Sequence, residues 1–354
     1  MPGHCAPCAV LWLVTGGGGF ARSAGRNTGP PTGSRPLAEN VPTWEDIAAA
    51  PILTKAYVPQ GAKRLWAQCV ASAVNQIIVY GDDKAWREWY MLPKAVLRSA
   101  DRGGGKKGKH KAESETRARA KAWLEGQRAE LWSPPRQAKG RPETREWGDT
   151  QRRARAVELA KEGLLGKACA SLVAEPPVQV NEEVLNQMRS KHPPSRTGEG
   201  IRCRGLREVC SSMAVKVMED SVLKAIRSFP KGSAPGPSGL RPQHLKDALA
   251  PGWADEVVRE LTKLVNKMAQ GEIPSKAAEH VMGASLTALS KPGGKGLRPV
   301  AVGETIRRCA AKTLWESVRV DVIAHLEPIQ MGVGTPMGAE AVVHLTRDWL
   351  LGES

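Results

Sequence analysis

The stretch Phe229–Gly239 reads FPKGSAPGPSG, and a second stretch, Lys291–Glu304, reads KPGGKGLRPVAVGE. The first holds three prolines and three glycines in eleven residues. Proline fixes φ and removes a backbone donor, whereas glycine permits φ values that other residues avoid. We therefore expect an ordered loop here, and not a helix or a strand.

The second stretch predicts a basic β-hairpin. The apolar run Leu286–Leu289 leads into a Pro292-Gly293-Gly294 turn, and Val300–Val302 returns from it. The cations that lie at the predicted tip are Lys291, Lys295 and Arg298. Lysine and arginine in such a place can meet phosphate groups, and the alternative is an ordinary surface hairpin with solvated lysines.

Charge and length suggest a chain that acts against a polyanion. The chain has 354 residues, 41% of them hydrophobic, and a net charge of +16. This length predicts two or three domains with at least one core. Residues 98–161 hold 18 Lys and Arg against 9 Asp and Glu, so this segment is either a nucleic-acid contact or a solvated, partly helical linker. Its candidate contacts are Lys106, Lys107 and Lys109, which lie in a Gly- and Lys-rich stretch, 103–111, that we expect to be a break between helices.

Cysteine usage and hydropathy predict an intracellular chain that does not enter a membrane. The seven cysteines are odd in number and scattered, unlike a secreted disulfide framework. No apolar run approaches the roughly 18 residues of a membrane helix. Residues 1–42 are rich in Gly and Pro, which predicts disorder. Within them, Cys5 and Cys8 have the spacing of half a zinc site, but a closed site needs four ligands.

Apolar periodicity predicts a mostly helical α+β fold. A stripe from Leu65 to Ile78 predicts a helix that ends at Gly81, followed by a helix with Asp83 as N-cap that reaches about Leu97. Further helices are expected over Thr150–Val173, Glu182–Ser190, Glu219–Ser228, Pro242–Leu249, Trp253–Gln270, Glu304–Leu326 and Met337–Leu350.

Several motifs, taken in order, resemble one family. Phe229–Gly239 continues as LRPQHL over Leu240–Leu245, and Lys291–Glu304 is followed by Arg307-Arg308. The series closes with Gln330, Gly332, Val333, Gly334, Thr335, Gly338 and Glu340. Over roughly 219–351 this order and spacing resemble the fingers of non-LTR retrotransposon reverse transcriptases. Weaker similarity to the N-terminal extensions of such elements involves Trp44–Ile47, Pro59, Trp66, Ala85-Trp86, Leu92–Lys94 and His192–Pro194.

The resemblance implies an incomplete right-hand polymerase in four parts. These are the N-terminus 1–42, a helical hairpin region 43–100, basic linker and helices 101–200, and fingers with the opening of the palm 201–354. The parent activity would be RNA-directed DNA synthesis with an RNA template, a DNA primer, deoxynucleoside triphosphates and Mg²⁺. Arg298 would contact the nucleotide's phosphates or stack on its base, and Lys291 would add a second cation. Further nucleic-acid contacts would come from Lys231, Lys295, Arg307 and Arg308, and the location would be nuclear.

The acids that hold the metal ions in this family have no counterpart here. Tyr80–Asp83 reads YGDD like a paired-aspartate signature, but it precedes the finger motifs and ends a helical stripe, so we interpret it as a helix end and an N-cap. After Glu340 the only aspartate is Asp348. We therefore expect no catalysis and no bound Mg²⁺ from this chain alone, with the palm supplied by a longer or a partner chain. The alternative is a non-enzymatic nucleic-acid-binding remnant.

Overall fold

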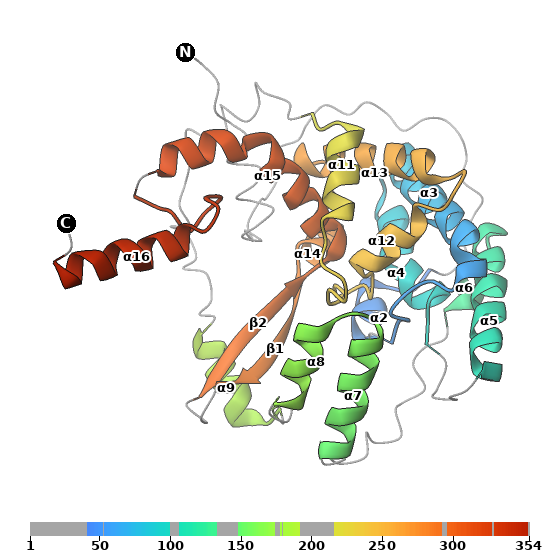
Figure 1. Ribbon diagram of the computed structural model, residues 1–354. Helices are drawn as coiled ribbons and strands as arrows, with labels where there is room; N and C mark the ends of the chain where they lie inside the picture. The colour runs from blue at the N-terminus through green and yellow to red at the C-terminus, as the bar shows by residue number, and fades with distance from the viewer. Residues whose placement is uncertain are drawn as a thin grey trace.

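The part of the chain that the structure describes is mostly helical and carries one small antiparallel sheet, as expected. The computed structural model describes residues 41–51, 53–99, 106–132, 148–173, 178, 180–191, 216–291, 296–327 and 329–352. Its helices are α2 (Trp44–Ala49), α3 (Lys63–Tyr80), α4 (Asp83–Val96), α5 (Lys106–Leu124), α6 (Arg128–Leu131), α7 (Asp149–Lys161), α8 (Leu165–Leu172), α9 (Glu182–Lys191), α11 (Glu219–Arg227), α12 (Pro242–Ala248), α13 (Ala254–Ala269), α14 (Ser275–Val281), α15 (Thr305–Leu326) and α16 (Gly338–Leu351). The strands are β1 (Ala284–Ser290) and β2 (Leu297–Gly303) (Figure 1). Cys5, Cys8 and nearly all of the expected disordered N-terminus lie outside the described residues.

The YGDD segment is a helix end followed by a helix start. Gly81 ends α3 in the left-handed conformation, with φ of 62°. The N-cap of α4 is Asp82, whose side chain accepts from the Ala85 N–H, and the prediction of Asp83 as the cap was wrong by one residue. The Oδ1 of Asp83 instead accepts from the Trp44 indole N–H at 2.7 Å. Both carboxylates thus serve the fold, because one caps a helix and the other ties α4 to α2.

Two expectations about the central region were wrong. The helix predicted over Thr150–Val173 is two helices, α7 and α8, because Gly163 takes a φ of 76° and turns the chain between them. The segment 103–111, expected to be a break, is helical from Lys106 onward. Helix α5 is rich in strong helix formers, and it packs along α3 through its buried residues Ala120 and Trp123.

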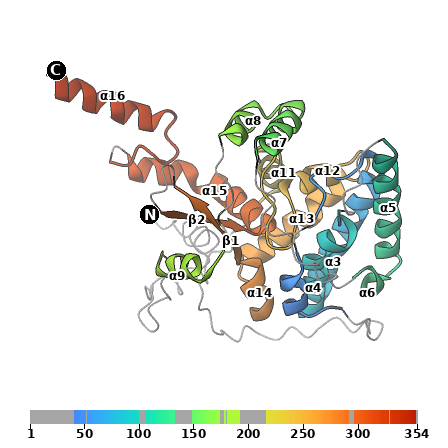
Figure 2. The ribbon, with the colours of Figure 1, turned by 90° about the horizontal axis from the view of Figure 1, so that it is seen from below.

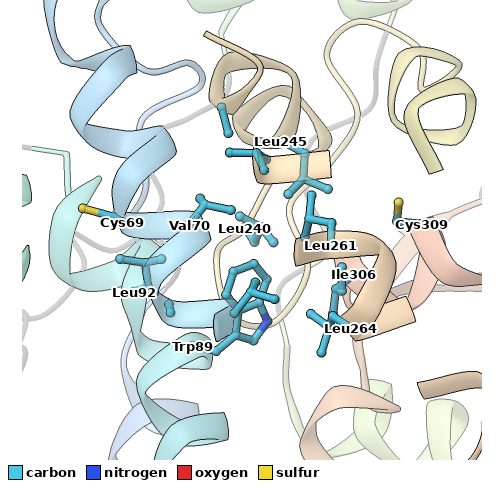
Figure 3. Close-up of a cluster of buried hydrophobic side chains, with 14 of the residues drawn as sticks. Cys69, Val70, Trp89, Leu92, Leu240, Leu245, Leu261, Leu264, Ile306 and Cys309 are labelled. Atoms are coloured by element: carbon cyan, nitrogen blue, oxygen red, sulfur yellow. The ribbon is translucent and has the colours of Figure 1, made fainter. Parts of the chain in front are cut away.

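One hydrophobic core joins the N-terminal helices to the region after residue 216. Buried residues of α2 to α5 and of the segment from Val217 to Leu314 form one large cluster, and Ala156, Leu159 and Ala168 form a small separate one. Figure 3 shows Val70 and Leu92 from the first half facing Leu240, Leu261 and Ile306 from the second. Helix α13 packs on α3, and α11 packs on α15. The core therefore crosses the boundary that the sequence places between 43–100 and 201–354.

Polar contacts reinforce this junction. The Trp66 indole N–H donates to the His244 carbonyl at 2.9 Å, and the Thr54 hydroxyl donates to the Gly239 carbonyl at 2.8 Å. Asp247 accepts from the Val58 N–H and pairs with Lys63, each at 2.9 Å. Because these contacts are buried or partly buried, both halves contribute to one folded unit.

The C-terminal helix extends away from this unit. In both views α16 projects from the body beyond α15 (Figures 1 and 2). It exposes large apolar side chains, including Val343, Leu345 and Trp349. An apolar face of this kind is a surface that normally packs against something else.

The buried His244 predicts a loss of stability in acid. Burial lowers the pKa of His244 from 6.5 to about 4, and its Nδ1 accepts from the Arg241 N–H. A depressed folded-state pKa gives stability that is complete above pH 6.5 and is lost as pH falls toward 4. Burial raises the pKa of Glu304. The stability that this carboxyl contributes at low pH is therefore lost as pH rises above the usual carboxyl range, opposite to the effect of His244. In a Glu304→Gln background, the free energy of unfolding should fall by up to about 3 kcal/mol between pH 7 and pH 4.

Urea unfolding followed by circular dichroism across this pH range measures the effect. The control is the double variant Glu304→Gln/His244→Asn, in which an amide oxygen stands in for Nδ1 as acceptor and does not titrate. Subtracting the two pH profiles removes contributions from other acids. Identical profiles for the two variants would show that His244 is not the source.

Candidate nucleotide and nucleic-acid site

The hairpin presents Lys291 and Arg298 on one face. Leu289 pairs with Arg298 and Ser290 with Leu297, and the Lys291 N–H donates to the Gly296 carbonyl at 2.9 Å, which extends the ladder by a residue. Because side chains alternate along a strand, Lys291, Leu289 and Arg298 share a face. Arg298 is exposed and Lys291 is partly exposed, and among the described residues neither has an ion-pair partner.

The same face continues to the base of the hairpin. It carries Thr287, Val300 and Ser285, and Thr287 is exposed. Ser285 also lines a hollow of about 210 Å³ that is bordered by Tyr90, Pro237 and His280. The cations of the tip thus lie at the end of a partly exposed face with hydroxyl and apolar groups, and α9 packs beside β2 (Figure 1).

Arg307 and Glu304 fix the hairpin to the body. The guanidinium of Arg307 donates to the carbonyl of Met282, just before β1. The same guanidinium lies against Gly303, the last residue of β2, where an added Cβ would be 3.5 Å from Cζ of Arg307. The Glu304 N–H donates to the Gly283 carbonyl at 3.4 Å. Both ends of the hairpin are therefore held at the start of α15, which sets the direction in which the tip points.

Glu304 also anchors the Pro/Gly loop, Phe229–Gly239. Its carboxylate accepts from the Ser238 N–H at 3.0 Å, the Ser238 hydroxyl at 2.8 Å and the Thr305 N–H at 2.9 Å. Burial raises the pKa of Glu304, and these donors oppose the shift. The Thr305 hydroxyl donates to the Leu240 carbonyl at 2.6 Å. One buried side chain thus connects the loop, the end of β2 and the first turn of α15.

Arg308 closes the other side of the loop. Its guanidinium donates to the Ala234 carbonyl at 2.8 Å and to the Thr305 hydroxyl at 2.9 Å, and it lies 5.9 Å from the centre of the Phe229 ring. Burial lowers the pKa of both Arg307 and Arg308. These two arginines hold the loop and the hairpin in place, and their contact with nucleic acid stays a prediction.

The remaining predicted contacts are spread over the surface. Lys231 is exposed on the Pro/Gly loop. Lys295 lies outside the described residues. Lys106, Lys107 and Lys109 lie in the first turn of α5, and their side chains also lie outside the description. The exposed cations of α5 that the structure does describe are Lys111, Arg117 and Lys121. The hairpin tip and α5 are therefore separate basic surfaces.

Sequence reasoning missed the contacts that position the site. The sequence places Glu304 in a motif and at the start of a predicted helix, whereas two of its three hydrogen bonds reach Ser238, 66 positions away. The one signal was an acid directly before an apolar helical stripe, which is typical of an N-cap. Its side chain indeed accepts from the Thr305 N–H.

Neither a metal centre nor a membrane span appears in the described part of the chain. No three His, Cys, Asp or Glu side chains there are grouped to hold a metal ion. No described helix combines the length and the apolar character needed to cross a bilayer. Comparison with protein-family models, curated proteins and solved structures finds no match for this chain.

Proposed function

We propose that this chain provides the fingers of a reverse transcriptase of the non-LTR retrotransposon type, and that its hairpin binds the triphosphate of an incoming deoxynucleotide. The observation that carries the proposal is the placement of Arg298 and Lys291 on one face of a hairpin that the Glu304 backbone and Arg307 fix to the body. The order of the motifs from Phe229 to Glu340 supports the same assignment.

Phosphate binding is the chemistry that this geometry suits. A guanidinium presents a planar fork of donors to phosphate oxygens, and an ammonium adds a compact charge. Phosphoryl-transfer enzymes act largely by positioning and by neutralising phosphate charge, so a rigidly held cationic hairpin is a useful part. The described residues do not form a site that fits the Mg²⁺ of the complete enzyme, and the proposed role is confined to holding the nucleotide.

Replacing both cations is expected to abolish most nucleotide binding. The variant Arg298→Gln/Lys291→Gln should bind a fluorescent deoxynucleoside triphosphate at least tenfold more weakly, because each charge-assisted hydrogen bond contributes about 1.5–3 kcal/mol. Fluorescence anisotropy at constant ionic strength measures the dissociation constants. Both residues are at least partly exposed, so the thermal unfolding midpoint should stay that of the wild type.

The matched control is Arg319→Gln/Lys276→Gln, which removes two exposed charges elsewhere on the body. Its affinity should stay within about twofold of wild type, because exposed charges beyond the Debye length are screened. If both double variants bound the deoxynucleotide equally weakly, the loss of affinity would be due to overall charge and not to the hairpin. Unchanged binding in the hairpin variant would refute the proposal.

The second candidate is a non-enzymatic nucleic-acid-binding protein. The observation that favours it is the row of exposed cations on α5, Lys111, Arg117 and Lys121. Salt-dependent RNA binding without affinity for deoxynucleoside triphosphates would favour this candidate. Primer extension by the chain, in contrast, would show that it supplies a complete catalytic site.

A further inference from the structure

Helices α7 and α8 dock on the Pro/Gly loop and bring distant basic residues together. The Lys167 ammonium of α8 donates to the carbonyls of Lys231 and Gly232, each at 2.9 Å. A Cβ added at Gly232 would lie 3.0 Å from Cδ1 of Leu164, in the turn between the two helices. In Figure 1 the loop that follows α11 descends to the end of α8, and Figure 2 again places α7 and α8 beside α11.

Five cations meet at this junction from three separate segments. We call them the basic junction: Arg155 and Lys167 from α7 and α8, Lys231 from the loop, and Arg241 and Lys246 beside and within α12. Burial and then the charge of Arg155 lower the pKa of Arg241, and burial and then Lys231 lower that of Lys246. Arg155 is thus near Arg241, and Lys231 is near Lys246.

Among the described residues, acids offset little of the charge of the basic junction. Glu158 pairs with Arg155 at 3.5 Å, but both side chains are more than half exposed, and such pairs contribute little. Asp247, the acid that lies on α12, is engaged by Lys63 and the Val58 N–H. A cluster of like charges whose described counterion is one exposed, weakly held carboxylate is expected to attract an anion.

Arg241 is the residue most clearly prepared for such a ligand. Its Nε is enclosed yet has no hydrogen-bond partner among the described residues, and no described acid pairs with its guanidinium. Lys167 and Lys246 differ, because each donates to loop carbonyls and holds the junction together. Arg241 as a whole is partly exposed, and a guanidinium without an acid partner can donate to a phosphate oxygen.

We propose that the basic junction binds the phosphodiester backbone of a nucleic-acid strand, with Arg155, Lys231 and Arg241 as phosphate contacts. Five cations on three segments exceed what one isolated phosphate requires, whereas a backbone presents charges in series. The chemistry is shared by RNA and DNA, because no base or sugar contact is invoked. This site is separate from the hairpin tip and does not depend on nucleotide binding there.

The test compares two double variants of the full chain that lose the same charge. Arg155→Gln/Lys231→Gln removes two contacts, and both residues are exposed, so folding is retained. Arg153→Gln/Arg319→Gln is the control, because Arg153 is exposed on α7 about 200° around the helix from Arg155. Fluorescence anisotropy with a labelled single-stranded RNA, and with DNA of the same sequence, measures affinity over a range of salt.

For the junction variant, affinity should fall about 25-fold near 0.1 M salt, and the slope of log affinity against log salt should become shallower by about 1.4. The control should lose less than about threefold, and Arg241→Gln alone should lose about fivefold. RNA and DNA should lose affinity equally. An unchanged slope, equal losses in both double variants or a loss confined to RNA would overturn the proposal. Deoxynucleotide affinity should stay at the wild-type value, which separates this test from that of the hairpin.

Discussion

Replacing Trp66 with alanine should lower the free energy of unfolding by about 4 kcal/mol, a large part of the stability of a typical domain. The side chain is fully buried in α3. Its ring lies 6.0 Å from that of His244 in an edge-on arrangement, and its N–H donates to the His244 carbonyl. The substitution leaves a cavity and an unpaired carbonyl at the contact between the two halves of the core.

Trp66→Ala is expected to unfold in one cooperative transition. Because one hydrophobic cluster includes both α3 and α13, the N-terminal helices and the region after 216 should unfold together. Urea unfolding followed by far-ultraviolet circular dichroism and by tryptophan fluorescence measures this. The control is Trp349→Ala, since this indole on α16 is 79% exposed and its removal should cost less than about 0.5 kcal/mol. Two separate transitions in Trp66→Ala would contradict the shared core.

The elements of this fold were largely predictable where apolar periodicity is strong. The stripe from Leu65 to Ile78 gives α3, and the Gly81 end follows from its freedom to take a positive φ. Helix α5 was missed because Gly and Lys dominate its start and its burial on α3 is not a local property. The turn at Gly163 was missed because one glycine within an apolar pattern is compatible with a continuing helix.

The site was predictable only in part, for a related reason. The hairpin and the shared face of Lys291 and Arg298 follow from strand alternation, a local rule. The docking of α8 on the Pro/Gly loop joins Lys167 to Lys231, and no local pattern reports a contact over 64 residues. The engagement of Arg308 with the Ala234 carbonyl is likewise visible only in three dimensions.

Replacing Gly236 with alanine is expected to cost about 4 kcal/mol, an effect as large as that of Trp66→Ala. A Cβ at this position would lie 2.6 Å from Oε2 of Glu304, 2.7 Å from its Cα and 2.8 Å from the Thr305 nitrogen. Two of these atoms belong to the backbone at the start of α15, so the loop must move away. Glu304 would then lose its two Ser238 donors while it remains buried, and removing donors from a buried carboxylate is strongly destabilising.

The matched control is Gly166→Ala on α8, where an added Cβ meets nothing within 4 Å. There alanine should stabilise by up to about 1 kcal/mol, because it is the better helix former. Urea unfolding measures both variants. Since Glu304 joins the Pro/Gly loop to the end of β2, Gly236→Ala should also weaken deoxynucleotide binding at the hairpin more than Gly166→Ala does. Wild-type stability in Gly236→Ala would mean that the loop and α15 are not packed as closely as these distances require.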